Sequence, residues 1–139
     1  MKSFLTLSII LISFSAFTQK VEDSQIMIRL ADSVGIHQKV KDALIKNDFI
    51  IKEIGHRDTI ITYPRVLTNM TGYAIARVVI KSNNAIITGI YGLKKLNYFG
   101  SSIYPKGFKQ IVFFDGSKTW PLLKLVADDI GGHHTFTKQ

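Results

Sequence analysis

Aromatic and basic side chains alternate along one glycine-rich stretch, residues 91–109. Its aromatic residues are Tyr91, Tyr98, Phe99, Tyr104 and Phe108, and its lysines are Lys94, Lys95, Lys106 and Lys109. Aromatic rings can stack on sugar or base faces, and lysines attract anionic groups. Glycines and a proline argue against one continuous helix or strand. We expect a long loop that is either a binding surface or a connection whose rings pack inward while its lysines stay solvated.

Two adjacent histidines near the C-terminal end, His133 and His134, are the residues best suited to binding a metal. Asp128 and Asp129 lie a few positions earlier and could add carboxylate ligands. Structural and catalytic metal sites generally need three or four fixed ligands, which adjacent histidines do not supply alone. We treat both histidines as weak candidates and expect neither a metal nor another cofactor.

Residues for covalent or acid–base catalysis are sparse. The chain has no cysteine and no Gly-x-Ser-x-Gly nucleophile motif, and Ser101 and Ser102 have no histidine near them in sequence,. A glycosidase would need a pair of carboxylates, and none of the ten Asp and Glu residues falls within positions 59–114. The sequence therefore favours a binding protein over an enzyme, and a small hydrolase remains an alternative.

Positive charge is concentrated in the middle of the chain. The whole sequence carries a formal net charge of +8. Between Thr59 and Phe114 there are seven Lys and Arg residues, including Arg77 and Lys81, and no Asp or Glu. Such asymmetry bears on partners and solubility rather than on fold. The block is either a solvated basic surface or a face that meets anionic lipid head groups, acidic glycan or an acidic protein.

The first eighteen residues have the layout of a secretory signal peptide. Lys2 supplies a basic start, an uncharged apolar run extends from Phe4 to Phe17, and Ala16 and Thr18 place small residues before a cut at Gln19,. A membrane anchor is the alternative, but the uncharged run is shorter than the roughly 20 residues that a spanning helix needs. We expect cleavage after residue 18.

Export and the lack of cysteine together limit where the protein works. Without a cysteine, no lipid can be attached in the manner of a bacterial lipoprotein, and no disulfide can form,. We expect a periplasmic or extracellular protein with no transmembrane anchor after cleavage. Nucleic acid is a poor partner for an exported protein, so the expected partners are an envelope glycan, an anionic lipid or a protein.

Hydrophobic periodicity predicts two helices and several strands. The strongest strand pattern is residues 73–81, where Ala74, Ala76, Val78 and Ile80 form one face and Arg77 lies on the other,. The elements expected after residue 32 are a helix over 33–47, a hairpin of 49–54 with 59–63, a hairpin of 73–81 with 85–91, a strand over 110–114, and a helix from Ser117 to Ile130. Residues 26–30 fit either a short strand or the start of a helix.

These elements predict an α+β fold in two layers. Two amphipathic helices would cover one face of an antiparallel sheet of about four to six strands. The expected organisation is a signal peptide over 1–18, an N-terminal segment over 19–32, one domain over 33–132 and a flexible tail over 133–139. The other face of the sheet would be open to solvent or to a partner.

The segment from Ala43 to Pro64, ALIKNDFIIKEIGHRDTIITYP, resembles small exported proteins of unknown function with a fold like that of the TATA-box-binding protein. The shared features are a helix that ends in a polar pair, a Phe-x-Ile strand, an acidic turn and an Ile-x-Thr strand. A terminal helix carrying Trp120 is compatible with this group. The resemblance implies an α+β envelope protein, and it transfers neither an active site nor the DNA binding of the fold's namesake.

The function expected from the sequence is non-catalytic binding in the cell envelope through a basic, aromatic-rich face. The candidate ligand-binding residues are Tyr91, Lys94, Lys95, Tyr98, Phe99, Tyr104, Lys106, Lys109, Arg77 and Lys81. One alternative is a small-ligand-binding protein with a pocket between the sheet and the helices. The oligomeric state stays open.

Overall fold

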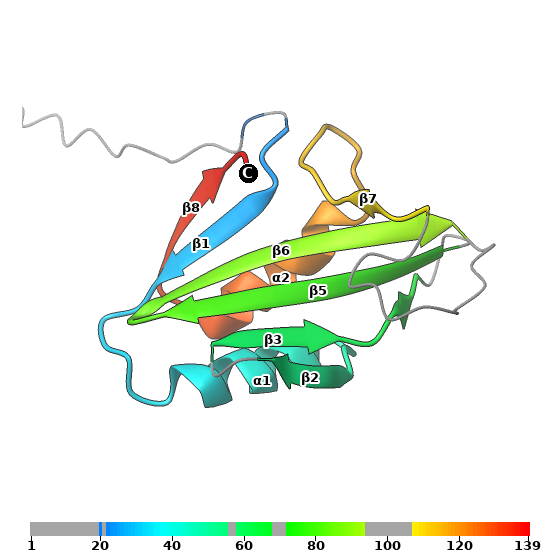
Figure 1. Ribbon diagram of the computed structural model, residues 1–139. Helices are drawn as coiled ribbons and strands as arrows, with labels where there is room; N and C mark the ends of the chain where they lie inside the picture. Colours follow the sequence, from blue (N-terminus) through cyan, green and yellow to red (C-terminus); the bar gives the residue numbers. More distant parts are fainter. Residues whose placement is uncertain (1–19, 21, 56–57, 68–71, 94–106) are drawn as a thin grey trace, which may run out of the picture.

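A computed structural model describes residues 20, 22–55, 58–67, 72–93 and 107–139 (Figure 1). The predicted signal peptide, residues 1–18, lies outside this part of the chain. So do six of the candidate ligand-binding residues. They are Lys94, Lys95, Tyr98, Phe99, Tyr104 and Lys106.

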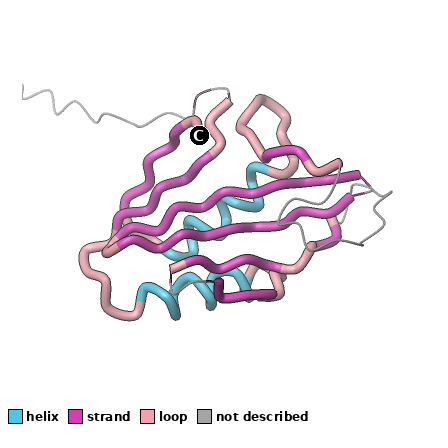
Figure 2. The backbone as a smooth tube through the Cα atoms, in the orientation of Figure 1, coloured by secondary structure: helices cyan, strands magenta, loops and turns pink. Residues whose placement is uncertain are grey.

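An antiparallel sheet with two helices behind it forms the described part of the molecule (Figures 1 and 2). The strands are β1 (Gln25–Arg29), β2 (Ile51–Gly55), β3 (Thr59–Thr62), β4 (Arg65–Val66), β5 (Gly72–Lys81), β6 (Asn84–Leu93), β7 (Lys109–Gln110) and β8 (His133–Thr137). Their order is β2-β3-β5-β6-β1-β8, with β4 pairing β5 and β7 pairing β6. The predicted α+β class is confirmed, and the eight strands exceed the four to six expected.

The two helices follow the predicted spacing of apolar residues. Helix α1 (Ile36–Lys46) buries Ile36, Val40, Ala43 and Leu44. Helix α2 (Trp120–Ile130) buries Trp120, Leu123, Val126, Ala127 and Ile130. Apolar residues three or four apart share one side of a helix, and both helices turn that side toward the sheet. Neither helix is long and apolar enough to span a membrane.

The hairpin of β5 and β6 is the centre of the sheet. Ala74, Ala76, Val78 and Ile80 are almost completely buried, as the alternating pattern predicts. On the opposite face, Arg77 and Val79 are only half-buried, while Ile75 is buried. The layer of side chains between the sheet and the helices is therefore the core, and the second face of the sheet carries no helix (Figure 1).

The C-terminal segment corrects one prediction, because residues expected to be a flexible tail form β8. Gly131 and Gly132 both have positive φ, 80° and 83°, and turn the chain back after α2. Strand β8 then pairs antiparallel with β1, and the ring of Phe136 lies 6.2 Å from that of Trp120. The predicted stop at the two glycines was right, but it is a turn into a further strand.

Two other segments clarify or change the sequence prediction: residues 25–29, which fitted either a strand or a helix, and residues 110–114, which were expected to form a strand. Residues 25–29 form strand β1, which lies between β6 and β8. The strand expected over 110–114 is reduced to β7 at Lys109–Gln110. Beyond it, Ile111 N donates to Gly89 O at 2.8 Å, and Phe113 N donates to Asp23 O at 2.7 Å. The chain leaves β6 here and crosses to the segment before β1, so one regular ladder cannot continue.

Candidate functional site

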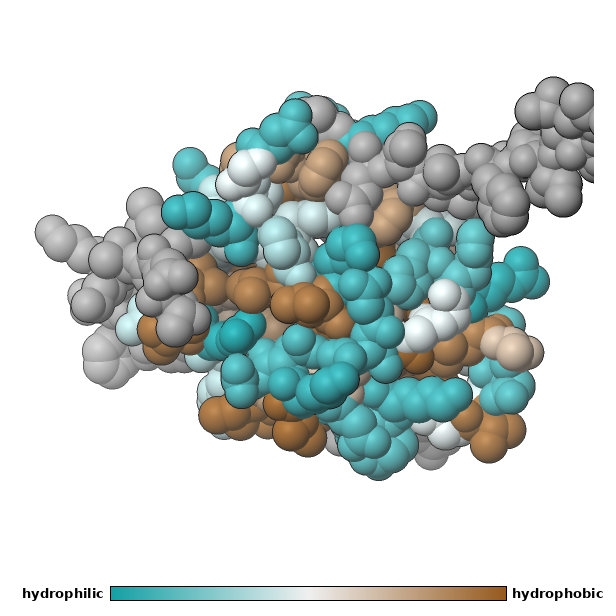
Figure 3. Space-filling model, turned by 180° about the vertical axis from the view of Figure 1, so that it is seen from behind, coloured by the Kyte–Doolittle hydropathy of each residue, from teal (hydrophilic) through white to brown (hydrophobic). Residues whose placement is uncertain are grey.

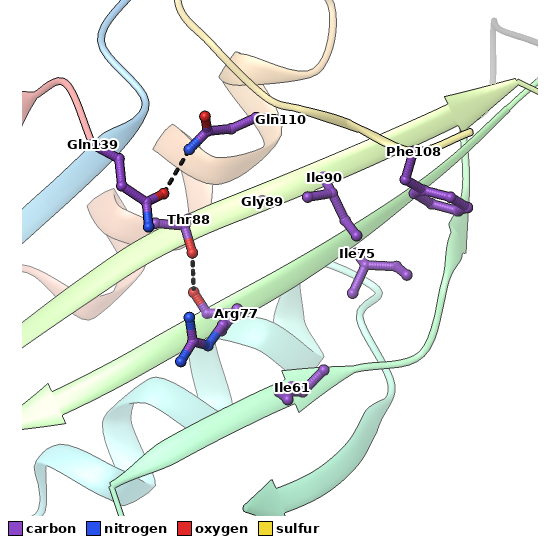
Figure 4. A pocket seen from close by; sticks show the side chains of 9 residues that line it. All are labelled: Ile61, Ile75, Arg77, Thr88, Gly89, Ile90, Phe108, Gln110 and Gln139. Carbon is purple, nitrogen blue, oxygen red and sulfur yellow. Dashed lines mark hydrogen bonds between the residues drawn. The ribbon is translucent and has the colours of Figure 1, made fainter. Parts of the chain in front are cut away.

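A pocket of about 290 Å³ lies on the helix-free face of the sheet (Figure 4). Its lining comes from β3, β5, β6, the segment around β7 and the last residue. The residues are Ile61, Ile75, Arg77, Thr88, Gly89, Ile90, Phe108, Gln110 and Gln139. Ligand pockets commonly measure about 300–1,000 Å³, so this one suits a small ligand.

Strand register brings the central lining residues together. Arg77 on β5 lies opposite Thr88 on β6 and opposite Ile61 on β3. Two residues away along the same strands, Ile75 lies opposite Ile90. Side chains two apart on a strand share a face, and all five therefore point away from the helices. The alternation that builds the core thus also assembles the pocket.

Gly89 contributes to the pocket only through its backbone. A Cβ atom at this position would point to the helical side and lie 2.8 Å from Ile111 Cδ1 and 3.1 Å from Leu123 Cδ1. Such contacts are too short for an ordinary packed core. A glycine here lets Ile111 and Leu123 press against the back of β6 while Thr88 and Ile90 face the pocket.

Two hydrogen bonds connect polar residues of the lining (Figure 4). Gln110 Nε2 donates to Gln139 Oε1 at 2.6 Å, which joins the β7 segment to the C-terminal residue. Thr88 Oγ1 donates to the backbone oxygen of Arg77 at 3.5 Å. The second distance is long for a hydroxyl donor, so the Thr88 hydroxyl is only weakly engaged.

Arg77 is the one residue with a charged side chain in the described lining of the pocket. No described carboxylate lies within ion-pair distance of its guanidinium group. Lys138, which precedes the lining residue Gln139 in sequence, is paired with Glu22. The hydrogen bond from Lys138 holds the pKa of the Glu22 carboxyl below its usual value. Arg77 therefore differs from Lys138 in offering an uncompensated positive charge.

The four described candidates from the sequence do not share one surface. Arg77 lines the pocket, and Lys81 lies on the same face at the exposed end of β5. Tyr91 packs against the core on the helical side. Lys109 is exposed and pairs in register with Tyr91, which places it on the side of the sheet away from the pocket. Only Arg77 and Lys81 are brought to the helix-free face.

The two candidate metal ligands lie in β8. His134 Nδ1 is 3.6 Å from Asp128 Oδ1, and Asp128 also pairs with Lys124. His134 Nε2 is buried with no hydrogen-bond partner among the described residues. Neighbouring residues of a strand point to opposite faces, so His133 and His134 do not converge. Within the described ranges, no three His, Asp or Glu side chains are placed to share a metal ion.

Sequence reasoning missed most of the pocket. Eight of the nine lining residues were not among the candidates, and they are Ile61, Ile75, Thr88, Gly89, Ile90, Phe108, Gln110 and Gln139. One signal was present in the sequence. On the second face of the hairpin 73–91, Arg77 is a charged residue among isoleucines such as Ile75 and Ile90. Gln110 and Gln139 carry no such signal, since only the folded chain brings them together.

The helical side of the molecule is largely hydrophilic, with separate apolar patches (Figure 3). Exposed apolar residues on the helices include Ile45 on α1 and Leu125 on α2. Scattered exposed apolar residues are normal for a soluble domain. The hollow on the opposite face is thus the better candidate site.

The chain matches no protein-family model, and searches of the curated proteins and of the solved structures find no similar chain. The resemblance to exported proteins with the fold of the TATA-box-binding protein stays a prediction. The geometry of the pocket is therefore the main indication of function.

Proposed function

We propose that this protein is an exported, non-catalytic binding protein of the cell envelope that holds an anionic ligand on the helix-free face of its sheet. The observation that carries the proposal is Arg77, a half-buried residue that lines a pocket and whose guanidinium has no acidic partner among the described residues. A partly desolvated charge without a partner is unfavourable. An anionic ligand would supply the missing partner.

The charge distribution supports an anionic ligand over a cationic one. No Asp or Glu occurs between Thr59 and Phe114, the segment that provides β3, β5, β6 and β7. A negatively charged ligand would therefore meet little repulsion from these strands. Arginine binds carboxylate and phosphate oxygens in a fork geometry, so Arg77 would orient the ligand as well as attract it.

The chemistry of the described lining supports binding over catalysis. General acid–base and nucleophilic catalysis use His, Asp, Glu, Cys, Lys or an activated Ser. The lining offers arginine, threonine and glutamine as its polar side chains. Arginine keeps its proton at all ordinary pH values, so it can bind an anion but is a poor proton shuttle.

Export through an N-terminal signal peptide is part of the proposal. Cleavage after Thr18 would leave Gln19 as the first residue of the mature protein. Mass spectrometry of the protein recovered from the periplasm or medium tests this. A mature chain that begins at residue 19 supports export, and an intact N-terminus on a cytoplasmic protein would contradict it.

Binding is tested by comparing Arg77→Gln with Lys81→Gln, which removes a charge from the same strand and face outside the pocket. The probes are a uronic-acid oligosaccharide, glycerol phosphate and octanoate, titrated calorimetrically at low and high salt. We expect at least one probe to bind the wild type and Lys81→Gln alike, and Arg77→Gln at least tenfold more weakly. Binding that is equally strong in both variants would overturn the role of Arg77.

A further inference from the structure

The pocket has a polar end and an apolar end (Figure 4). Arg77, Thr88, Gln110 and Gln139 gather at one end, and Ile75, Ile90 and Phe108 at the other. Ile61 lies below them on β3. A uniformly charged ligand such as a bare anion would use only half of this lining.

The polar end matches one negative charge. Arg77 contributes a single positive charge with five N–H donors in a rigid fork. Thr88 Oγ1 holds its present acceptor at 3.5 Å, so the hydroxyl can turn to a ligand oxygen at a shorter distance. Gln110 donates one amide proton to Gln139, and further amide N–H donors remain on both side chains. A carboxylate has one charge and two oxygens for these donors, whereas a phosphate dianion would leave charge uncompensated.

The apolar end suits a short hydrocarbon chain. Register places Ile75 directly opposite Ile90, one pair along from Arg77 and Thr88. Successive pairs on one face are about 6.8 Å apart along the strands. A ligand whose head group meets Arg77 would therefore extend its apolar body over the two isoleucines toward Phe108. The volume of about 290 Å³ limits this body to a small one.

We propose that the pocket binds a small amphipathic carboxylate, with its carboxylate on Arg77 and its hydrocarbon chain over Ile75, Ile90 and Phe108. This proposal rests on the proposed function and names the class of its ligand. The two ends of such a ligand are recognised differently. The carboxylate is recognised by the charge of Arg77 and by hydrogen-bond donors, and the hydrocarbon chain by its burial. Each additional buried methylene strengthens binding roughly fourfold.

The first measurement compares three probes on the wild-type protein by isothermal titration calorimetry at pH 7 and low salt. They are octanoate, octanol and acetate. Octanoate is expected to bind at one saturable site, and octanol and acetate at least tenfold more weakly. Equal affinity for octanoate and octanol would overturn the carboxylate, and equal affinity for octanoate and acetate would overturn the chain.

The second measurement tests the polar and the apolar end of the pocket with separate variants. Arg77→Gln should remove the preference for octanoate over octanol, while Lys81→Gln should keep it. Ile90→Ala should weaken octanoate about tenfold or more and leave acetate unchanged. Ile86→Ala is its control, because Ile86 lies on the same face of β6 as Ile90 but outside the pocket lining. Thermal unfolding of each variant verifies that the fold is intact.

The outcomes separate this inference from the function on which it rests. Loss of octanoate binding in Arg77→Gln and Ile90→Ala, but in neither control, supports the amphipathic site. Absence of octanoate binding, with Arg77-dependent binding of glycerol phosphate or the uronic-acid oligosaccharide, overturns the carboxylate pocket and leaves the proposed function standing. Failure of all three anionic probes contradicts both.

Discussion

Thr62 Oγ1 accepts a hydrogen bond from the backbone N–H of Ala76 at 3.0 Å inside the sheet. The ladder between β3 and β5 ends one pair earlier, at Ile61 and Arg77. Pairing with β5 resumes where Arg65 of β4 lies opposite Ala74. The threonine side chain thus replaces a backbone carbonyl in the gap between two short strands and holds β5 in place beside the pocket.

Thr62→Val is expected to destabilise the protein by about 1–3 kcal/mol, because it leaves the buried N–H of Ala76 without an acceptor. Valine has nearly the same shape as threonine, so packing changes little. The free energy of unfolding from urea titration measures the effect. The pocket residues on β5 would also shift, so weaker ligand binding should accompany the loss of stability.

Two control variants identify the hydrogen bond as the cause. Thr62→Ser keeps an acceptor oxygen and should recover most of the lost stability. Thr59→Val changes a half-buried threonine on the same strand and should alter stability by less than about 1 kcal/mol. If Thr62→Val proves as stable as the wild type, the side chain is not a structural part of the sheet.

Gly132→Ala is expected to destabilise the entry into β8. The residue has φ of 83°, where an L side chain is strained by about 1–2 kcal/mol,. Its Cβ would also lie 2.6 Å from the backbone oxygen of Arg29 on β1. Overpacking of this kind adds about 1–3 kcal/mol. Chemical denaturation measures the total.

Gly131→Ala separates the two contributions to that loss. Gly131 has a similar φ of 80°, but a Cβ there would have no heavy atom within 4 Å. Its variant should therefore show the backbone strain without the clash. The ψ of −163° at Gly131 is itself a conformation nearly confined to glycine,. The close approach of Gly132 to β1 would therefore be contradicted by a Gly132→Ala variant that is as stable as the wild type.

Phe136→Ala tests whether β8 belongs to the folded core. The Phe136 ring packs 6.2 Å from Trp120, the one tryptophan of the chain, and the residue is half-buried. The loss should be about 2 kcal/mol, below the 3–5 kcal/mol of a fully buried phenylalanine. Trp120 fluorescence reports the local change, and Thr135→Ala, on the opposite face of the strand, serves as control. An unchanged stability and spectrum would show that the segment is the free tail that the sequence suggested.

The helices and the central hairpin could be predicted because their signals are local. Val40 and Leu44 repeat at helical spacing, and Ala74 to Ile80 alternates as a half-buried strand does. Strand β8 could not be predicted this way. Its burial depends on Trp120 and on pairing with β1, more than a hundred positions away in sequence. Two glycines before it looked like an end because a helix stop and a reversal use the same residues.

Of the residues that line the candidate site, only the charged one, Arg77, could be predicted from the sequence. Arg77 stands out in sequence because it interrupts an apolar strand within an acid-free block. Tyr91 and Lys109 were grouped with it by their proximity in sequence, yet register places them on the helical side. Gln110 and Gln139 meet only because the chain crosses from β7 to the segment before β1. Long-range pairing, absent from local patterns, decides which side chains line the pocket.

The link between the two helices should be sensitive to acid. Lys46 and Asn47, at the end of α1, both bond the carboxylate of Asp129 near the end of α2, with Asn47 Nδ2 at 2.7 Å. The hydrogen bond from Lys46, and to a smaller extent that from Asn47, lowers the pKa of the Asp129 carboxyl below its ordinary value of 3.8. In the unfolded chain the carboxyl takes up its proton at a higher pH than in the folded protein. The stabilisation is therefore complete above about pH 4–5 and is lost as the pH falls below that range.

Asp129→Asn should consequently lower the Tm at pH 7 by a few degrees, roughly 1–4 °C, and by less at pH 3, where the wild type has begun to lose the same interaction,. Lys46→Gln should have a similar effect at pH 7, and the double variant should be little worse than either single one, because both remove one contact.

Lys39→Gln removes a charge from the same helix and controls for net charge. A Tm difference between wild type and Asp129→Asn that is constant from pH 7 to pH 3 would refute the carboxylate as the source of the stabilisation. Strictly additive losses in the double variant would show that Lys46 and Asp129 act separately, and that the ends of α1 and α2 are held together by other contacts.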